Sequence, residues 1–323
     1  MNSLILSVLR VLSDGQFHSG ENLAQRFNVS RTTIWKTIHA GKAQDIDIFS
    51  VRGRGYKLAI PLMFLDVADI LKNCAVANQV RLKIYPELES TNSTLTQLAN
   101  ENSPSGTCIM AEIQTAGKGR RGRKWASSLG ASLTFSLLWR FDCGAAGLSG
   151  LSLVVGVALI RALNEVGVTA QLKWPNDVLI NHKKLAGILI ELQGDMDGPS
   201  AAVIGIGINR CLTKALQQLI DQPVTDIVQH QNNINANELM GNLLTHLFIV
   251  LTQFSVKGFS AFQAEWQHYH AYQLQNVRLL APDGTEQTGI ALGVDFDGAL
   301  LFEGINGKKR VISGEVSLRA LAS

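Results

Sequence analysis

Apolar and polar positions recur at helical spacing through the first forty residues of the chain. Leucine, isoleucine and valine repeat every three or four positions over residues 3–12, which predicts a helix with one buried face. A second, shorter helix is predicted to begin at Ser19, and Ser30 is a good N-cap for a third helix over residues 31–39. The isoleucines of this third helix are predicted to face a core, which leaves its polar side chains outside.

The outward face of the third predicted helix carries hydroxyls and cations. Two strand-like runs follow it, at residues 46–51 and 56–59, and Arg52 and Arg54 lie in the turn between them. A polar helix after a tight turn, followed by a basic hairpin, is typical of a winged helix-turn-helix that binds DNA. A three-helix packing domain with an incidental charge excess is the alternative. We favour DNA binding, with contacts predicted at Ser30, Arg31, Thr32, Thr33, Lys36, Thr37, Arg52 and Arg54.

Beyond residue 60 the pattern becomes a mixture of buried strands and amphipathic helices. Strands are predicted around residues 81–85, 109–110, 133–139, 178–180, 184–192 and 204–209, and helices from near Asp66, after Ser90, and at 151–163, 237–254 and 259–270. Residues 151–163 are the most apolar of these, but they are too short to span a bilayer and predict a buried helix. Residues 215–231 are polar and irregular, and we interpret them as a candidate mobile loop.

The last fifty residues predict a small all-β module. Asp283-Gly284, Asp297-Gly298 and Asn306-Gly307 are typical hairpin turns. Strand-like runs lie between them, at residues 277–281, 289–294, 299–302 and 310–318. We expect a barrel resembling an SH3 domain, which is too small to act alone and packs on the preceding domain.

Composition narrows the class of protein. The 323 residues are 46% hydrophobic and 17% charged, as expected of a globular chain. Net charge is +3, but residues 1–60 hold eight lysines and arginines against four acidic residues, which indicates a polyanion as the partner of this unit alone. The four cysteines are far apart, which excludes a disulfide frame or a zinc site and favours reduced thiols in a cytoplasmic protein. The sequence indicates no signal peptide.

Residues 112–125 hold the densest run of cations and glycines in the chain. Five cations lie between Lys118 and Lys124, which is tolerated in a folded domain where an anion sits among them. The spacing Gly117-x-Gly119-x-x-Gly122 matches the dinucleotide motif, but a loop and a strand follow where that motif needs a helix. A P-loop also fails, because no Lys-Ser or Lys-Thr pair follows. We therefore predict a phosphate- or carboxylate-binding loop of another kind, over a solvated surface loop.

Four other stretches carry candidate chemistry. Hydroxyls and an amide follow Glu89, where they could cap a helix or bind a small ligand, and capping is the simpler interpretation. The run 173–177 presents polar side chains at a turn, and Lys184 could be a surface lysine or could hold an anion in a pocket. Gly205 and Gly207 let a flat group approach the backbone. We interpret His268 and His270 as surface or structural histidines.

Taken together, these stretches resemble the biotin protein ligases, and specifically the bifunctional bacterial type that also represses the biotin operon. The resemblance covers almost the whole chain. It rests on the winged helix and on the motifs at residues 89–92, 114–125, 173–177, 184–189, 205–209 and 314–315. It implies an α+β multidomain fold: a winged helix-turn-helix at residues 1–62, a ligase domain with a mixed sheet at 63–270, and an SH3-like β-barrel at 271–323.

The resemblance also implies a two-step reaction. Biotin attacks the α-phosphate of ATP, with Mg²⁺, and the resulting biotinyl-5′-AMP is then attacked by a lysine of the biotin carboxyl carrier protein of acetyl-CoA carboxylase. The adenylate is expected to act as corepressor, favouring a homodimer on the two-fold operator DNA of the biotin operon. No membrane partner and no metal-ligand set of the protein's own are implied.

Site roles follow by motif match. Arg120 and Lys184 are the expected catalytic residues. The biotin-binding set implied is Ser90, Thr91, Asn92, Gln114, Gly117, Lys118, Gly119, Arg120 and Lys184. The nucleotide-binding set implied is Arg120, Arg121, Trp125, Lys173, Asn176, Asp177 and Asn209.

The chain departs from the family's pattern at three places. Lys118 stands where arginine is usual, Ser313 replaces a glycine, and residues 210–224 lack the tryptophan expected over adenine, which leaves Val224 or its neighbours there. These departures bear on how firmly the ligand is enclosed, and hence on dimerisation and repression. The alternatives are a repressor that only senses a metabolite, a ligase whose repressor function is weak or lost, and a ligase for lipoate or octanoate.

Overall fold

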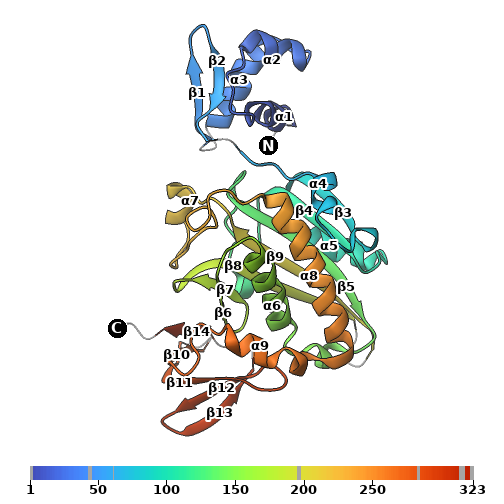
Figure 1. Cartoon of the computed structure of the whole chain (residues 1–323), viewed down its shortest axis with the longest axis vertical. Coiled ribbons are helices and arrows are strands. Elements are labelled where there is room, and N and C mark those ends of the chain that lie inside the picture. Colours follow the sequence, from blue (N-terminus) through green and yellow to red (C-terminus); the bar gives the residue numbers. More distant parts are fainter. Residues whose placement is uncertain are drawn as a thin grey trace.

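The structure, a computed structural model, describes residues 3–42, 46–60, 62–194, 198–281, 284–312 and 317–320. These residues form sheets of two, seven and five strands, which follow one another along the chain (Figure 1). The two-stranded sheet belongs to the N-terminal unit, which lies at one end of the molecule and has a separate hydrophobic cluster that Leu129 of the central domain joins. The other two sheets share one continuous core.

The N-terminal unit has the predicted winged helix-turn-helix form. Its elements are α1 (Ser3–Leu12), α2 (Gly20–Arg26), α3 (Arg31–Lys42), β1 (Ile48–Val51) and β2 (Gly55–Leu58). The side chain of Ser19 accepts a hydrogen bond from the backbone N–H of Asn22 and so begins α2. Ser30 does the same for the N–H of Thr33 at the start of α3, at 3.1 Å. The predicted cap at Ser30 is confirmed, and the second helix begins directly after Ser19, where its start was predicted.

The central sheet is mixed, as predicted. Its strands are β3 (Arg81–Leu88), β4 (Thr107–Gln114), β5 (Ser132–Phe141), β6 (Gln171–Lys173), β7 (Asp177–Ile180), β8 (Lys183–Gly194) and β9 (Ser200–Asn209). They lie in the order β3-β4-β5-β9-β8-β7-β6, with β3 and β4 parallel and the remaining pairs antiparallel. The order places the ends of β4, β7, β8 and β9, which carry the candidate motifs, within one sheet.

Helices cover this sheet. They are α4 (Val67–Lys72), α5 (Thr91–Asn100), α6 (Leu151–Glu165), α7 (Lys214–Gln218), α8 (Ala236–Lys257) and α9 (Gln263–His268), with short 3-10 turns at Ala77–Gln79, Arg120–Gly122, Ala145–Leu148 and Phe259–Ala261. The single helix predicted over residues 259–270 is therefore a 3-10 turn followed by α9. The segment predicted to be irregular from residue 215 contains most of α7, because Thr213 caps a short helix there.

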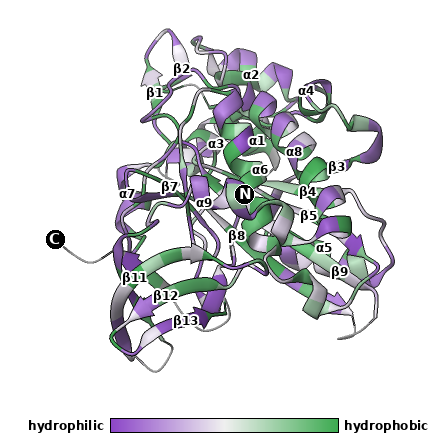
Figure 2. Cartoon of the chain, turned by 60° about the horizontal axis from the view of Figure 1, so that its bottom comes forward, coloured by the Kyte–Doolittle hydropathy of each residue, from purple (hydrophilic) through white to green (hydrophobic). Residues whose placement is uncertain are grey.

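Two apolar stretches, Ala145–Glu165 and Ala236–Lys257, are long and hydrophobic enough to cross a membrane by length and composition alone. Within the fold, 67% and 56% of their most apolar windows are buried. Figure 2 shows α6 as mostly hydrophobic and α8 beside it, inside the body of the protein. Their apolar character is thus used in the core, as the pattern predicted for residues 151–163.

The C-terminal module is a five-stranded antiparallel sheet. Its strands are β10 (Asn276–Leu280), β11 (Glu286–Val294), β12 (Leu300–Gly304), β13 (Gly307–Val311) and β14 (Ser317–Ala320), in the order β13-β12-β11-β10-β14. The single strand predicted over 310–318 is wrong, since β13 ends at Val311 and β14 pairs with a different neighbour. Asp283, Ser313, Gly314 and Glu315 lie outside the described residues.

One buried tryptophan fixes the C-terminal module to the central domain. The indole Nε1 of Trp174 donates to the backbone oxygen of Gly298, in the β11–β12 turn, at 3.1 Å. Ser149 donates to the neighbouring oxygen of Asp297 at 2.7 Å. Trp174 directly precedes the polar turn at residues 175–177, so the joint between the domains is built into the candidate site.

A second joint connects the N-terminal unit to the central sheet. The guanidinium of Arg10, on α1, lies 3.1 Å from a carboxylate oxygen of Glu112, on β4. The same oxygen accepts the backbone N–H of Leu65, in the connecting segment, at 3.2 Å. Glu112 is 5% exposed, so three segments meet at one buried carboxylate.

Candidate functional site

The glycine-rich basic loop folds back on itself as a narrow hairpin. The N–H of Trp125 donates to the oxygen of Gly117 at 2.8 Å, and the N–H of Gly119 donates to the oxygen of Arg123 at 2.7 Å. A Cβ on Gly117 would lie 2.6 Å from the oxygen of Trp125, so only glycine fits there. The 3-10 turn Arg120–Gly122 ends at the third glycine, and a loop follows it where a dinucleotide-binding motif would begin an α-helix, as predicted.

The hairpin ends at Trp125, whose ring lies flat against β9. A Cβ on Gly207 would come within 2.4 Å of the indole. The group predicted to approach the backbone at the two strand glycines is thus, at Gly207, a side chain of the chain itself. Lys184 lies on β8, and its ammonium is 5.8 Å from the centre of the Trp125 ring.

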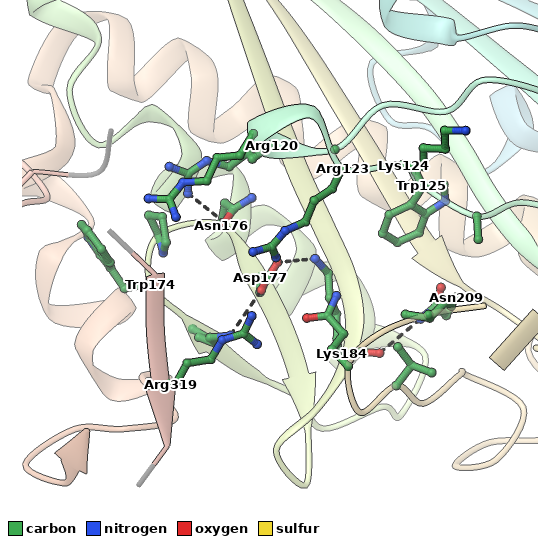
Figure 3. Close-up of a pocket in the computed structure, with 18 residues that line it drawn as sticks. Arg120, Arg123, Lys124, Trp125, Trp174, Asn176, Asp177, Lys184, Asn209 and Arg319 are labelled. Atoms are coloured by element: carbon green, nitrogen blue, oxygen red, sulfur yellow. Dashed lines mark hydrogen bonds and ion pairs between the residues drawn. The ribbon is translucent and has the colours of Figure 1, made fainter. Parts of the chain in front are cut away.

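Beside Trp125 lies a cation-rich cavity of about 110 Å³ (Figure 3). It is lined by Gly119, Arg120, Arg121, Arg123, Lys124, Trp125, Ala126, Lys173, Trp174, Pro175, Asn176, Asp177, Lys184, Asn209, Ile220, Gln222, Val224 and Arg319. Seven of these are lysine or arginine, and one is a carboxylate. Such an excess of cations in a concave site is stable only with an anion in it or water around it, which points to a phosphate-bearing ligand.

Asp177 is the one carboxylate among these lining residues. One of its oxygens lies 2.6 Å from the ammonium of Lys184, and the other lies 3.6 Å from that of Lys173. Burial opposes the charged form of Asp177, but attraction to Lys184 and then Lys173 outweighs it, so the pKa is lowered. For Lys173 the main effect is burial, which lowers the pKa of its ammonium group. Asp177 thus holds the ammonium groups of Lys173 and Lys184 at the cavity wall.

Arg120 reaches across the cavity from the hairpin to the turn after β6. Its Nη1 donates to the side-chain oxygen of Asn176 at 3.2 Å, and Asn176 in turn donates to the oxygen of Ile188 at 2.7 Å. Burial, followed by repulsion from Arg121, lowers the pKa of Arg120. Arg120 is thus a partly desolvated cation held in one orientation, as electrostatic stabilisation of a phosphate requires.

A second, smaller cavity of about 60 Å³ opens on the other side of Trp125. It is lined by Ser90, Thr91, Asn92, Gln114, Lys118, Gly119, Arg120, Trp125, Phe135, Asn176, Lys184, Gly187, Ile188, Leu189, Gly205, Ile206 and Gly207. Eight of its seventeen lining residues are polar or charged, and the other nine are apolar residues or glycine, a combination that suits a small molecule with both a ring system and hydrogen-bonding groups. The side chain of Lys118 is exposed, so the hairpin presents backbone to the cavity at that position.

The polar groups of this cavity form one network. The oxygen of Gln114 accepts from the backbone N–H of Thr91 at 2.7 Å and from its hydroxyl at 3.2 Å. The hydroxyl of Ser136 lies 2.8 Å from that of Thr91 and 2.6 Å from the side-chain oxygen of Asn92. The amide of Asn92 donates to Glu191 at 2.7 Å. Each side chain is therefore oriented by its neighbours.

Ser90 has both of the roles that the sequence left open. Its hydroxyl accepts from the N–H of Ser93 and caps α5, and the residue also lines the smaller cavity. The two roles are compatible, because a helix N-terminus that begins at a cavity wall turns its first residues toward the cavity.

Five residues line both cavities: Gly119, Arg120, Trp125, Asn176 and Lys184. They form a partition between the larger, cation-rich cavity and the smaller one. A molecule with a small ring system in one cavity and a phosphate in the other would place the bond between them at Arg120 and Lys184. The two residues predicted to be catalytic are both among the five.

The predicted nucleotide residue Asn209 is buried, and its amide is already used by the fold. It donates to the backbone oxygens of Lys184 and Thr225, at 3.2 and 3.1 Å. These bonds hold the segment after β9 beside Lys184. The backbone of Lys184 is hydrogen-bonded to the residues on either side of Val224. Val224, which with its neighbours was expected in the place of a tryptophan over adenine, lines the larger cavity together with Ile220 and Gln222.

Several residues at this site were not anticipated, among them Ser136 and Glu191, which hydrogen-bond to Asn92 of the smaller cavity, and Arg319, which lines the larger one. Ser136 lies opposite Gly205 in the β5–β9 pair, and Glu191 lies on the far part of β8. Arg319 comes from β14 of the C-terminal module. None belongs to a motif, because strand pairing and domain docking, not local spacing, bring them to the site. Alternation along residues 133–139 could have placed the side of β5 that carries Ser136.

The exposed face of α3 matches the predicted DNA contacts with one exception. Arg31, Thr32, Lys36 and Ser30 are exposed, Thr33 is partly exposed, and Arg52 and Arg54 lie at the tip of the wing. Thr37 is wrong as a surface contact. It is 9% exposed, and its hydroxyl donates to the oxygen of Thr33 at 2.9 Å within the helix. Residue 37 falls on the side of α3 that packs with the isoleucines.

Known proteins share this architecture. Residues 5–57 match the model of the HTH domain, residues 85–209 that of the biotin/lipoate A/B protein ligase family, and residues 275–319 that of the biotin protein ligase C-terminal domain. The bifunctional ligase/repressor BirA of Salmonella typhimurium is 36% identical to this chain, over 98% of the chain and 97% of the relative. The chain belongs to the bifunctional biotin ligase/repressor family. The predicted family is confirmed.

Relatives of the ligase part extend the comparison. A biotin–[acetyl-CoA-carboxylase] ligase of Paracoccus denitrificans is 33% identical, over 71% of this chain and 96% of the relative. The structure of the biotin protein ligase from Aquifex aeolicus in complex with biotin and ATP superimposes with a TM-score of 0.64 at 30% identity, covering 75% of this chain and 99% of that one. The match at residues 85–209 contains the basic hairpin and the ion-paired residues Lys173, Asp177 and Lys184.

Proposed function

We propose that this chain uses ATP to attach biotin to a lysine of the biotin carboxyl carrier protein, and that it represses the biotin operon when biotinyl-5′-AMP is bound. The observation that carries the proposal is the partition between the two cavities. Biotin's ring system suits the smaller cavity, where a polar network lies beside apolar side chains, and ATP suits the cation-rich one. The reacting carboxylate and phosphate then meet at Arg120 and Lys184.

In the first step a carboxylate oxygen of biotin attacks the α-phosphorus of ATP. A new oxygen–phosphorus bond forms, the bond to the leaving pyrophosphate breaks, and negative charge builds on the phosphoryl oxygens. Arg120 and Lys184 are placed to stabilise that charge, and they also offset the repulsion between two anions. Ser90, Thr91, Asn92 and Gln114 hold the ring system, so that the carboxylate is oriented for attack.

Mg²⁺ enters this scheme as part of the ATP substrate. Asp177 is the only carboxylate among the described lining residues of the larger cavity, and both of its oxygens are ion-paired. Over the described residues there is also no group of three or more histidines, cysteines or acids that could hold a metal ion. A single carboxylate beside a phosphate site fits an ion held mostly by ATP and water, and its role is to neutralise phosphate charge.

In the second step the acceptor lysine, as a free amine, attacks the carbonyl carbon of the adenylate. The carbon–nitrogen bond forms, AMP leaves, and the amine loses a proton. Water must be kept from the anhydride until the acceptor arrives. The Gly117–Trp125 hairpin and the segment that carries Val224 lie on two sides of the cavity and are suited to this protection.

Repression is proposed to follow from retention of the same adenylate. With the ligand enclosed, a homodimer would present two winged helices to the two halves of an operator. The protein would act in the cytoplasm, where the carrier protein and the DNA are both found, and we propose no membrane partner.

The test is acceptor labelling, read as a mass shift on a purified carrier domain incubated with protein, biotin, ATP and Mg²⁺. Lys184→Ala should slow labelling at least a hundredfold, because the loss of one oriented charge at the reacting phosphate costs about 3 kcal/mol. Lys183→Ala is the matched control, since this exposed neighbour on β8 should label at the wild-type rate. Arg120→Gly should still form adenylate but release it, and modify lysines on bystander proteins.

The alternatives give different results in related assays. A repressor that only senses a metabolite would bind biotin and DNA but would not exchange labelled pyrophosphate into ATP. A ligase for lipoate or octanoate would label a lipoyl domain, and excess lipoate would compete with biotin. Wild-type protein that labels no carrier domain would overturn the ligase proposal.

A further inference from the structure

The face of α3 that is proposed to meet DNA carries an unusual residue at its centre. Trp35 is 51% exposed. The chain has five tryptophans, all within the described residues, and the other four are buried or partly buried. An exposed indole on a helix that is otherwise polar and charged on this side leaves apolar area in water, which is unfavourable unless a partner covers it.

Helix geometry places Trp35 within the cationic surface rather than beside it. Arg31, Trp35 and His39 are four residues apart, so they form one stripe along α3, and all three are exposed. Thr32 and Lys36 lie on the adjacent stripe. The rings of Trp35 and His39 are 4.1 Å apart, centre to centre, and inclined at 48°. The indole is therefore supported on one side and flanked by cations.

The chemistry of this stripe indicates what it contacts. Arg31 and Lys36 suit phosphate oxygens or guanine, and Thr32 suits a base edge. Indole has one donor and a large apolar face, which neither phosphates nor the polar edges of bases can match. The apolar group that the floor of the major groove offers is the 5-methyl group of thymine. A protein partner is disfavoured, because the surrounding charges complement a polyanion.

We propose that Trp35, held by His39, reads thymine through its 5-methyl group and so contributes to the sequence specificity of this protein. The proposal rests on the proposed DNA-binding function of the N-terminal unit. Covering one methyl group is worth about a fourfold change in affinity, so one or two thymines per half-site should be distinguishable from bases that lack the methyl group.

The test begins with the full chain, biotin and ATP, and a duplex library with a randomised centre. Sequences that the wild-type protein retains are remade with each thymine replaced in turn by deoxyuridine, which lacks only the methyl group. We expect about fourfold weaker binding at one or two positions related by the two-fold axis. Trp35→Ala should bind the selected duplex more weakly and should no longer distinguish thymine from uracil at those positions.

Phe49→Ala is the control, because Phe49 is an exposed aromatic residue of the same unit, on the wing, and should keep the thymine preference. Biotin labelling by Trp35→Ala should stay at the wild-type rate, which shows that the ligase domain is folded, and its unfolding transition in urea should match that of Phe49→Ala. Wild-type binding that is indifferent to every deoxyuridine would overturn the inference. So would a Trp35→Ala variant that keeps the preference. A wild-type protein that selects no sequence would instead overturn the proposed repressor function.

Discussion

The indole of Trp125 occupies space that a glycine leaves open. Gly207 lies under the ring, and Gly205, two residues before it, lies against Asn92, where a Cβ would come within 2.1 Å of the side-chain oxygen. The two glycines of β9 thus set the depth of the smaller cavity. An added methyl group at either would push a ligand-facing side chain into the site.

Gly207→Ala should weaken biotin binding about tenfold, since displacing a packed side chain costs about 1–3 kcal/mol. Titration calorimetry with biotin measures this. Gly20→Ala is a suitable control, because a Cβ there would meet its nearest neighbour at 3.4 Å, an ordinary contact. If the clash with the indole is the cause, adding Gly207→Ala to Trp125→Ala should weaken biotin binding little more than Trp125→Ala does alone.

At this scale, sequence patterns predicted residues whose chemistry is carried by a local motif. Lys184 and Asp177 are examples, since a charged residue beside an apolar run is visible in the chain itself. Ser136 and Arg319 could not be found in this way, because their roles depend on a strand partner and on a docked module. Thr37 failed for a different reason: its polar side chain satisfies itself within the helix and turns inward.

Among the elements, the segment between β9 and α8 has the least regular structure beside the site, yet it is firmly tied. Asp226, which is 3% exposed, accepts from the N–H of Leu212 at 3.1 Å and from the N–H of Gln229 at 3.0 Å. One carboxylate therefore joins the two ends of a loop whose middle lines the larger cavity, the one proposed to hold ATP.

Asp226→Ala should raise the KM for ATP about tenfold, because it leaves buried N–H groups without acceptors and frees the loop. Biotin affinity should not change, since no residue of this loop lines the smaller cavity. Asp221→Ala removes an exposed acid from the same loop and should leave both values as in the wild type. Equal loss of biotin and ATP affinity in Asp226→Ala would contradict this division of the site.

The type of most elements was predictable, but several boundaries were not. The helix over residues 3–12, the helix starts at Ser19 and near Asp66, and the cap at Ser30 are local signals, and the structure has them as predicted. The division of residues 310–318 between β13 and β14 is not local, because each strand is defined by its partner in the sheet. The same holds for the order of the central sheet.

For the whole molecule, the connection between the DNA-binding unit and the ligase domain depends on Glu112. Burial raises the pKa of this carboxyl to about 7, although Arg10 and the N–H of Leu65 act to lower it. Its ordinary value is 4.5. Between these values the native state holds a proton that the unfolded chain has released, so this group makes stability fall as pH rises from 4.5 to 7.

His270 acts in the opposite sense. Burial lowers its pKa from 6.5 to about 4, so the unfolded chain binds a proton there first, and stability falls as pH falls through that range. The two effects oppose each other in the wild-type protein, and a single pH profile of stability would hide both. A difference between variants isolates one of them.

Glu112→Gln keeps the acceptor for Leu65 and removes the titration. Relative to the wild type, its free energy of unfolding should rise by about 2 kcal/mol between pH 5 and pH 7. Urea unfolding at a series of pH values measures the difference. Glu101→Gln, at an exposed position after α5, should follow the wild-type profile. Parallel profiles for Glu112→Gln and the wild type would show that this carboxyl does not titrate in the native state as proposed.

The five residues shared by the two cavities have a thermodynamic consequence. A ligand that settles against Trp125, Arg120 or Lys184 from one side fixes the surface that the other side presents. The two binding free energies then cannot be independent, and their coupling is reciprocal: whatever factor biotin applies to the affinity for ATP, ATP applies to the affinity for biotin. Whichever substrate binds first therefore changes the affinity for the other, through a wall that both of them touch.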